Sequence, residues 1–387
     1  MKEWIYVRAG DFIEFNPRLN IKKGITATKI SMDKLQPFSK KILGAESAVF
    51  TGGAKFRNGD TIMARITPCL ENGKTAFVDI LNDGEIGFGS TEFIVLRARK
   101  GISDPQFIYY LATSPFFRKQ AIKSMVGSSG RQRVQQNVLD NLELKVPDIV
   151  TQEKIGYILS CFDKKIAINK QINDNLELQA QSLVTEYIEK TPYTTHLSDI
   201  ITFDNGFAFQ SKTYLKQGKY KIITIKNVQD GRIDSTGTAF INELPQRVRE
   251  NCILSIGDIL LSLTGNVGRV GIVYEKNLLL NQRVARVVPF DKRLLPFLYF
   301  VFRQPSIKTQ LEMIAKGTAQ LNLSPIEALN LTISYEQSSA TALSQSLEAL
   351  YKIIISNQQE NLLLAQLRDT LLPKLMSGKI DVSSVQL

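Results

Sequence analysis

Groups that could carry catalysis are few in this chain. Its single histidine, His196, allows no histidine-based metal site and supplies little general acid–base equipment. The cysteines, Cys69, Cys161 and Cys252, form neither a paired metal motif nor a disulfide framework, which fits a reducing compartment. Carboxylates are plentiful, but no run of them has the clustering that a metal-dependent nuclease needs.

Motifs that bind nucleotides are incomplete as well. Gly73-Lys74-Thr75 resembles the end of a phosphate-binding loop, but Pro68 stands where that motif needs its first glycine. The glycine-rich stretch 265–271 does not fit the dinucleotide pattern G-x-G-x-x-G. The Asp/Asn-Pro-Pro-Tyr/Phe tetrapeptide of adenine methyltransferases is also missing. The sequence therefore predicts no catalytic residues, no metal site and no cofactor bound by this chain.

Basic and amide side chains, by contrast, recur in glycine-hinged loops. The formal net charge is +11, and the excess lies in residues 1–150 and 191–336. Arginine suits guanine edges and Asn or Gln suits adenine edges, whereas Lys, Ser and Thr contact phosphates. We therefore expect DNA contacts from Lys55, Arg57, Arg65, Lys74, Ser128, Arg131, Gln132 and Arg133, and from Lys226, Asn227, Arg247, Arg249, Arg269, Lys316, Thr318, Gln320 and Asn322. The loops at Gly130 and Gly317 are the preferred readers, and a solvated surface charge is the competing interpretation of each residue.

An internal repeat must position these side chains. Residues 11–15 and 199–203 share a pattern at an offset of 188, and residues 59–63 match 257–261 after an insertion of about ten residues in the second copy. Short β-branched and aromatic runs, broken by Gly, Asn and Asp, predict α+β domains over residues 1–150 and 191–336.

Each domain is followed by a helix with a heptad pattern. The first helix covers residues 151–190, and the second, together with a C-terminal tail, covers residues 337–387. Their apolar positions alternate by four and three, so the exposed seams must pair, and an antiparallel pair within the chain is favoured. The predicted fold class is thus α+β, with two pseudo-two-fold-related domains separated by a pair of long antiparallel coiled-coil helices.

Each seam carries two central asparagines, Asn169 and Asn173 in one helix, Asn357 and Asn361 in the other. A tolerated, hydrated polar position is one interpretation. The alternative is that buried seam amides fix the register of the pair. In an antiparallel pair Asn169 should face Asn361, and Asn173 should face Asn357.

The order domain, helix, domain, helix resembles the specificity subunit of type I restriction–modification systems over essentially the whole chain. The most specific stretches are residues 367–380, residues 220–228, and residues 137–147 followed by Gln152-Glu153-Lys154-Ile155. The second copy departs at residues 334–337, which lack the proline of the first, and this puts the hinge geometry there in doubt.

The resemblance implies a non-catalytic subunit whose two target recognition domains read the halves of an asymmetric, bipartite site in double-stranded DNA. It implies helices that act as spacer and as docking surface for two modification (methyltransferase) subunits. Restriction (translocase/endonuclease) subunits are the further partners it implies. S-adenosylmethionine, ATP and Mg²⁺ are then expected on the partners. The half-sites should lie about one DNA turn apart.

Two other classes of function stay open. A self-contained DNA-modifying enzyme would bind S-adenosylmethionine or cut DNA alone, and a coiled-coil adaptor with basic lobes would show no sequence-dependent affinity for duplex DNA. We expect no membrane partner, since no apolar run approaches the roughly 18–20 residues of a span. The N-terminal stretch has no apolar signal region, so a cytoplasmic location is expected.

Overall fold

The computed structural model describes residues 4–128, 130–317 and 321–386. The chain divides into two compact units: unit 1 is residues 1–167 with 363–387, and unit 2 is residues 168–362. Both divisions fall inside the long helices, so each unit contains a part of both.

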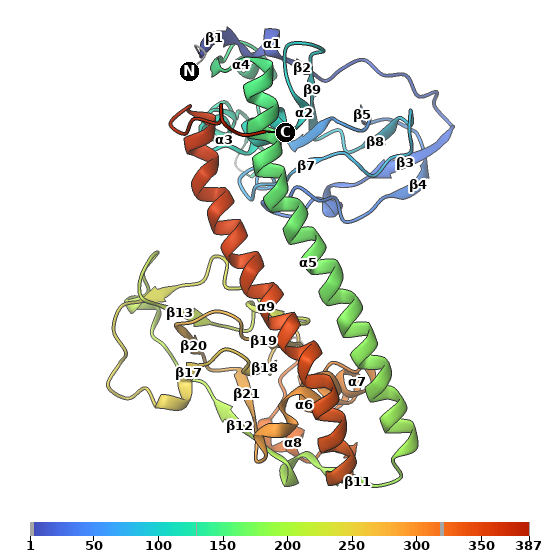
Figure 1. Ribbon diagram of the computed structural model, residues 1–387, viewed down its shortest axis with the longest axis vertical. Coiled ribbons are helices and arrows are strands. Elements are labelled where there is room, and N and C mark those ends of the chain that lie inside the picture. Colours follow the sequence, from blue (N-terminus) through green and yellow to red (C-terminus); the bar gives the residue numbers. More distant parts are fainter. Residues whose placement is uncertain (1–3, 129, 318–320, 387) are drawn as a thin grey trace. The chain divides into compact units, whose positions relative to one another are not determined.

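Two four-stranded sheets form the β-structure of unit 1 (Figure 1). The first is antiparallel, with the order β2 (Ile13–Phe15), β9 (Phe93–Ala98), β6 (Thr61–Ala64), β7 (Thr75–Phe77). The second is mixed, because β3 pairs with β8 in parallel, and has the order β4 (Glu46–Val49), β3 (Thr26–Ile30), β8 (Gly87–Gly89), β5 (Ala54–Phe56). A further ladder joins β1 (Ile5–Arg8) to β10 (Glu143–Val146).

Short helices complete unit 1: α1 (Ala9–Phe12), η1 (Met32–Lys34), α2 (Pro105–Thr113), α3 (Pro115–Lys123) and α4 (Gln136–Asp140). Helices α2 and α3 start where the sequence places a capping residue before a proline. Asp104 accepts a hydrogen bond from the N–H of Phe107 (2.8 Å), and Ser114 accepts one from Phe117 (3.3 Å). Helix α2 is almost wholly buried, and it packs with β6, β9 and the start of the first long helix in one core.

Unit 2 repeats this plan strand for strand. Its antiparallel sheet has the order β12 (Ile201–Asn205), β21 (Val284–Pro289), β18 (Ile259–Ser262), β19 (Val270–Ile272). Its mixed sheet has the order β16 (Phe240–Ile241), β13 (Tyr220–Ile223), β20 (Leu278–Leu280), β17 (Ile253–Leu254), with β13 and β20 parallel. The ladder of β11 (Thr194–His196) with β22 (Thr332–Ser334) corresponds to β1 with β10. The predicted internal repeat is therefore confirmed at the level of topology.

The remaining elements of unit 2 are η2 (Leu197–Asp199), η3 (Ser211–Thr213), η4 (Glu250–Cys252), η5 (Lys292–Leu294), α6 (Leu295–Phe302), α7 (Pro305–Ile314) and α8 (Pro325–Leu329). Hairpin β14 (Val228–Gln229)–β15 (Arg232–Ile233) lies in the connection between β13 and β16. Its turn is tied to the helices: Arg303 forms ion pairs with Glu177 and with Asp230 (3.3 Å), and Gln358 donates to the carbonyl of Gly231 (3.0 Å).

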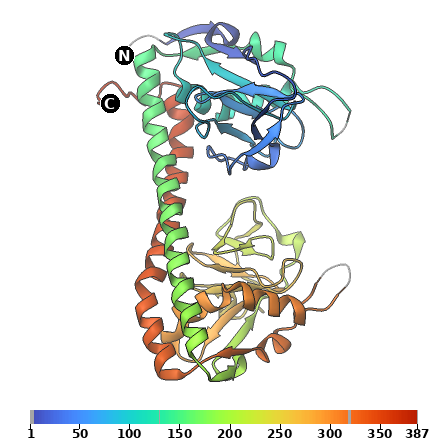
Figure 2. The ribbon, with the colours of Figure 1, turned by 90° about the vertical axis from the view of Figure 1, so that its right-hand side faces the viewer.

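The long helices are α5 (Ile149–Lys190) and α9 (Gln337–Met376), and they run antiparallel within each unit (Figures 1 and 2). Glu336 caps the start of α9. Its carboxylate accepts hydrogen bonds from the hydroxyl and N–H of Ser339 and from Ser338, and these bonds lower the pKa of Glu336 to about 2. The predicted class, two α+β domains with a pair of long antiparallel helices, is confirmed.

The four-and-three spacing of apolar residues predicts that Leu183 lies in the seam of α5, and the structure differs at this position. Leu183 is 41% exposed, whereas the next residue, Val184, is fully buried in the core of unit 2. An α-helix of 3.6 residues per turn drifts relative to a strict 3.5-residue repeat, so the buried face moves by one position toward the domain.

The four seam asparagines pair as the antiparallel pattern predicts. The amide of Asn169 donates to Oδ1 of Asn361 (3.0 Å), and the amide of Asn357 donates to Oδ1 of Asn173 (2.8 Å). Asn169 is fully buried, and its amide also reaches Glu360 at 2.6 Å. The predicted facing of the pairs is confirmed, whereas their role in fixing register stays a prediction.

The end of α9 and the C-terminal tail complete the core of unit 1. Leu372, Leu375 and Val382 are buried in the same cluster as Ala9 and Phe12. Beside them, Gly378 has φ +70° and lies directly against the indole ring of Trp4, where a Cβ atom would fall 2.9 Å from the ring. Lys154 on α5 donates to the carbonyl of Ser383 at 2.6 Å.

Candidate nucleic-acid interface

The two glycine loops occupy corresponding places in the units. Residues 126–133 follow α3 in unit 1, and residues 316–322 follow α7 in unit 2. Each loop is closed at its base by a pair of backbone hydrogen bonds: Val126 with Arg133 (3.0 and 2.9 Å), and Lys316 with Asn322 (3.0 and 2.8 Å). The described parts of both loops lie on the side of their unit away from α5 and α9 (Figure 2).

Each loop base is also tied to the connection after a central strand. In unit 1 the N–H of Val134 donates to the carbonyl of Arg65 (2.8 Å), and in unit 2 the N–H of Leu323 donates to that of Leu263 (2.7 Å). Loops that are fixed to a rigid scaffold in this way commonly carry binding residues.

Around the first loop, Ser128 and Arg131 are exposed, whereas Gln132 is half-buried with its N–H bound to the hydroxyl of Thr67 (3.0 Å). Arg133 forms a bidentate pair with Glu92 (2.6–3.0 Å), and these hydrogen bonds raise the pKa of the guanidinium. Glu92 lies 41 residues earlier in the chain, so no local pattern could have predicted it.

The other predicted residues of unit 1 are mostly held by the domain itself. Lys55 donates to the carbonyl of Leu19 (2.9 Å), Lys74 to that of Met32 (3.0 Å) and Arg65 to that of Val134 (3.1 Å). Only Arg57, of these four, has an exposed side chain. The structure therefore does not bring Lys55, Lys74 and Arg65 together with the first loop as free cations.

In unit 2, Lys226, Arg247 and Arg249 are exposed. Arg269 donates to Oε1 of Gln229 on the β14–β15 hairpin (3.0 Å), and Lys316 pairs with Glu327. Thr318 and Gln320 lie outside the described residues, whereas Asn322 is exposed and its Oδ1 accepts a hydrogen bond from Thr264 (2.8 Å).

The expectation for Asn227 needs correction. This side chain is 6% exposed, and it is engaged inside its own turn. Its Oδ1 accepts from the N–H and hydroxyl of Thr224 (both 2.9 Å), and its amide donates to the carbonyl of Asp234 (2.8 Å). We therefore no longer expect Asn227 to contact DNA. An asparagine in a tight turn serves the backbone as readily as a base.

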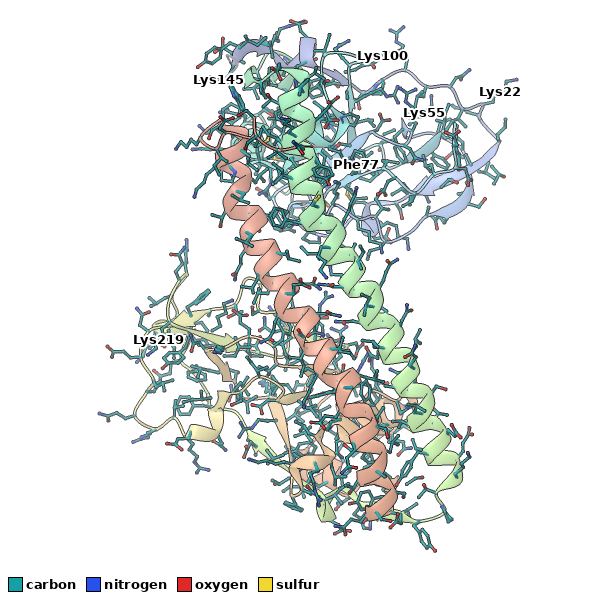
Figure 3. The ribbon with its side chains drawn as sticks, viewed as in Figure 1. Lys22, Lys55, Phe77, Lys100, Lys145 and Lys219 are labelled. Atoms are coloured by element: carbon teal, nitrogen blue, oxygen red, sulfur yellow. The ribbon has the colours of Figure 1, made fainter. Side chains whose placement is uncertain are left out.

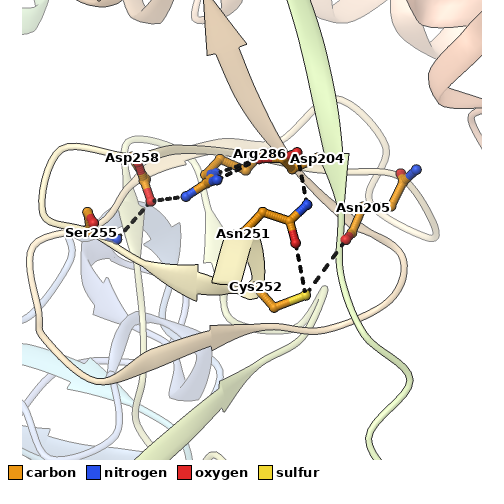
Figure 4. Close-up of polar contacts among 7 residues, drawn as sticks. All are labelled: Asp204, Asn205, Asn251, Cys252, Ser255, Asp258 and Arg286. Atoms are coloured by element: carbon orange, nitrogen blue, oxygen red, sulfur yellow. Dashed lines mark hydrogen bonds and ion pairs between the residues drawn. The ribbon is translucent and has the colours of Figure 1, made fainter. Parts of the chain in front are cut away.

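Ion pairs link strands of the antiparallel sheet in each unit, buried in unit 1 and half-buried in unit 2. In unit 1, Arg97 on β9 binds both oxygens of Asp60, which is 1% exposed, at 2.7 Å. In unit 2, Arg286 on β21 lies between Asp204 (2.5 Å) and Asp258 (3.2 Å), as Figure 4 shows. Burial lowers the pKa of Arg286, but its hydrogen bond to Asp204 and the charge of Asp258 outweigh this and raise it.

A second buried network lies in unit 1. The ammonium of Lys40 lies 5.2 Å from the ring centre of Phe77, which is labelled in Figure 3, and 4.9 Å from that of Tyr110. The Tyr110 hydroxyl donates to Asp163 on α5 (2.5 Å), and Asp163 in turn pairs with Arg368 on α9 (2.5 Å). Burial lowers the pKa of Lys40 to about 8, against the attraction of Asp163.

Exposed lysines that we did not predict add positive charge. Lys22, Lys100 and Lys145 extend from unit 1, and Lys219 extends from unit 2 (Figure 3). Lys219 lies over the ring of Tyr220 at 5.0 Å. Within the described ranges there is no group of three or more His, Cys, Asp or Glu side chains placed to hold a metal, and no helix long and apolar enough to span a membrane.

Comparison with known proteins follows the same division into two copies. Residues 1–178 and 193–364 each match the family described as type I restriction modification DNA specificity domain. The chain is 23% identical to the type I restriction enzyme MjaVIII specificity subunit of Methanocaldococcus jannaschii, over 99% of this chain and 94% of that protein. It is 24% identical to the HindI specificity subunit of Haemophilus influenzae, over 84% of this chain and 87% of that protein.

A solved structure supports the fold. The crystal structure of the type I restriction–modification system S subunit from M. genitalium superposes with a TM-score of 0.54 at 18% identity, over 97% of this chain and 96% of that one.

Proposed function

The chain belongs to the type I restriction modification DNA specificity family, and from that premise we propose that unit 1 and unit 2 each read one half of a bipartite DNA target. Its role is DNA specificity, and like the specificity subunits to which it is related it is not itself an enzyme. The observation that carries the proposal is the repeated placement of a glycine loop on the same strand order in both units.

The glycine loops of the two units carry different residues, so the two half-sites that they read should differ in sequence. The first loop offers Arg131 and an Arg133 oriented by Glu92, whereas the second is bracketed by Lys316 and Asn322. Because arginine favours guanine and amides favour adenine, two loops of unlike composition select unlike half-sites. The exposed lysines supply the sequence-independent part of the affinity through phosphate contacts.

The partners in this proposal are double-stranded DNA, two modification subunits docked on α5 and α9, and restriction subunits. The methyl donor S-adenosylmethionine, together with ATP and Mg²⁺, is carried by those subunits. The whole assembly works in the cytoplasm. The pairs Asn169–Asn361 and Asp163–Arg368 support a spacer role, because each binds α5 to α9 by polar contacts that a shift in register would break.

Co-expression with a modification subunit tests the proposal. We expect methylated adenines, mapped across the host genome, to fall in a two-part sequence with a fixed gap. The modification subunit expressed alone is the control and should give no such pattern. Methylation without a shared sequence, or within one continuous short site, would contradict the two-reader proposal.

A further inference from the structure

One exposed arginine of unit 2 has an unusual backbone. Arg283 lies in the turn between β20 and β21 with φ +72°, in the left-handed region that bulky L-residues rarely adopt. Its side chain is exposed. Among the residues that the structure describes, none forms a hydrogen bond or an ion pair with its guanidinium. The residue is thus placed at a backbone cost without a contact in the described part of the chain that accounts for it.

The surrounding backbone holds this turn rigidly. The carbonyl of Arg283 accepts a hydrogen bond from Leu263 (3.0 Å), and the N–H of Gln282 donates to the carbonyl of Phe207 (3.1 Å). The turn is closed by the N–H of Val284, which donates to the carbonyl of Asn281 (3.2 Å). Strained conformations that are fixed in this way gather at binding sites, where the strain pre-orients a side chain.

The turn lies next to the second glycine loop. Leu263, which binds the carbonyl of Arg283, also accepts the hydrogen bond from Leu323 that ties down the loop base. The next residue, Thr264, forms a backbone bridge with Asn322 and binds its side chain. Arg283 therefore stands beside the loop that we proposed as the reader of unit 2.

In unit 1 an arginine also lies at the corresponding turn, but it comes from the glycine loop and not from the turn itself. There the carbonyl of Glu92 accepts from the N–H of Arg65 (2.9 Å), and the N–H of Phe93 closes the turn on Ser90 (3.2 Å). Glu92 takes the place of Arg283 and binds Arg133 from the glycine loop. Both units thus hold a guanidinium at this turn, supplied by the loop in one and by the turn itself in the other.

We propose that Arg283 contacts a guanine edge in the half-site read by unit 2, an inference that rests on the proposed function. The guanidinium fork matches the O6 and N7 acceptors of guanine in the major groove, and a fixed backbone reduces the ordering cost of that contact. Neither the charge pattern nor the glycine loops of the sequence pointed to this residue. A left-handed φ can be expected from the sequence at a glycine, but not at an arginine.

The test uses the purified full-length chain and a library of DNA duplexes with a randomised central segment, followed by sequencing of the bound fraction. We expect the wild type to enrich a two-part sequence with a strongly preferred guanine in one half. Arg283→Gly should lose that preference by roughly 5- to 150-fold at one position and leave the other half-site unchanged. Arg283→Lys, which keeps the charge but not the fork, should retain only part of the preference.

Asn277→Gly is the matched control. Asn277 is also exposed, also lies in unit 2 and also has a positive φ (+61°), so the substitution repeats the backbone change without removing an arginine. Its selected sequence should equal that of the wild type. Because glycine adopts φ +72° freely, Arg283→Gly should melt at or above the wild-type temperature, and lost selectivity then cannot come from unfolding.

The possible outcomes distinguish a failure of the Arg283 contact from a failure of the proposed function on which it rests. A wild type that enriches no sequence overturns both. A wild type that enriches a two-part sequence, with the same sequence enriched by Arg283→Gly, overturns the role of Arg283 alone. Uniformly weaker binding with an unchanged sequence also overturns it, because that result assigns Arg283 to a phosphate.

Discussion

Replacing the buried seam pair Asn169–Asn361 gives a quantitative test of how α5 and α9 are held together in unit 2. In the single variant Asn361→Leu, the fully buried amide of Asn169 keeps its hydrogen bond to Glu360 (2.6 Å) but loses the acceptor of its second N–H, at 3.0 Å, and Oδ1 of Asn169 already lacks a partner among the described residues. A buried polar group left without its partner costs about 1–3 kcal/mol, so the free energy of unfolding should fall by that amount.

The double variant Asn169→Leu/Asn361→Leu should behave differently. It removes both amides and places two apolar side chains in the seam, where burial of a leucine contributes about 1.5–3 kcal/mol. We expect its stability to equal or exceed that of the wild type, which makes the two single changes strongly non-additive. The coupling between the positions should therefore be about 1 kcal/mol or more.

Urea unfolding, followed by the far-ultraviolet circular dichroism of the helices, measures all four members of this cycle. The pair Asn173–Asn357 (2.8 Å) serves as a second, independent cycle one turn away. If the effects of Asn169→Leu and Asn361→Leu add to within about 0.5 kcal/mol, the two amides do not interact in solution, and the proposed role of the pair in holding register fails.

Four further predictions follow from the contacts described above. Arg131→Ala should change base preference within one half-site only, as seen in the sequences selected from a duplex library, and unchanged selectivity would argue against readout by this loop. The pKa of Lys40 is lowered to about 8 from 10.5, so between these pH values the unfolded chain binds a proton that the folded chain has lost, and the stability of the fold rises with pH. Lys40→Met should remove up to about 3 kcal/mol of that rise, measured by urea unfolding at pH 7.5 to about 10.5. Arg97→Met leaves the Asp60 carboxylate buried and unpaired and should cost about 3–5 kcal/mol, whereas a combined Arg97→Met/Asp60→Leu change should recover most of it in the same unfolding assay. Insertion of one heptad into both α5 and α9 should lengthen the gap of the methylated sequence and preserve both half-sites, and altered half-sites would refute the spacer model.

The repeat, the long helices and the facing of the seam asparagines could be predicted because they depend on periodicity. A heptad pattern constrains every turn of a helix, so the spacing of apolar residues is sufficient to pair Asn169 with Asn361. Near Leu183 periodicity is no longer sufficient to predict the buried position, because the neighbouring Val184 is buried in its place. At that point the second domain, and not the partner helix, sets which side of α5 is buried.

The DNA-binding residues were harder to predict because charge and polarity do not reveal what a side chain already binds. Lys55 and Lys74 are bound to backbone carbonyls far along the chain, and Asn227 is bound within its own turn. Glu92 and Arg283 were missed for the opposite reason. Each of them lies in a turn that forms only when the strands pair, and the residues next to it in the sequence do not predict that turn.

The place of the C-terminal tail in unit 1 has a consequence for synthesis on the ribosome. Unit 2 is one continuous stretch of chain, residues 168–362, and can close its core as soon as that stretch has emerged. Unit 1 cannot, because Leu372, Leu375 and Val382 belong to its core and are translated only after unit 2. The N-terminal segment of unit 1 therefore waits, incompletely buried, until unit 2 and the end of α9 have been translated. A ribosome that stalls near residue 362 releases a chain in which the second reader is whole and the first is open.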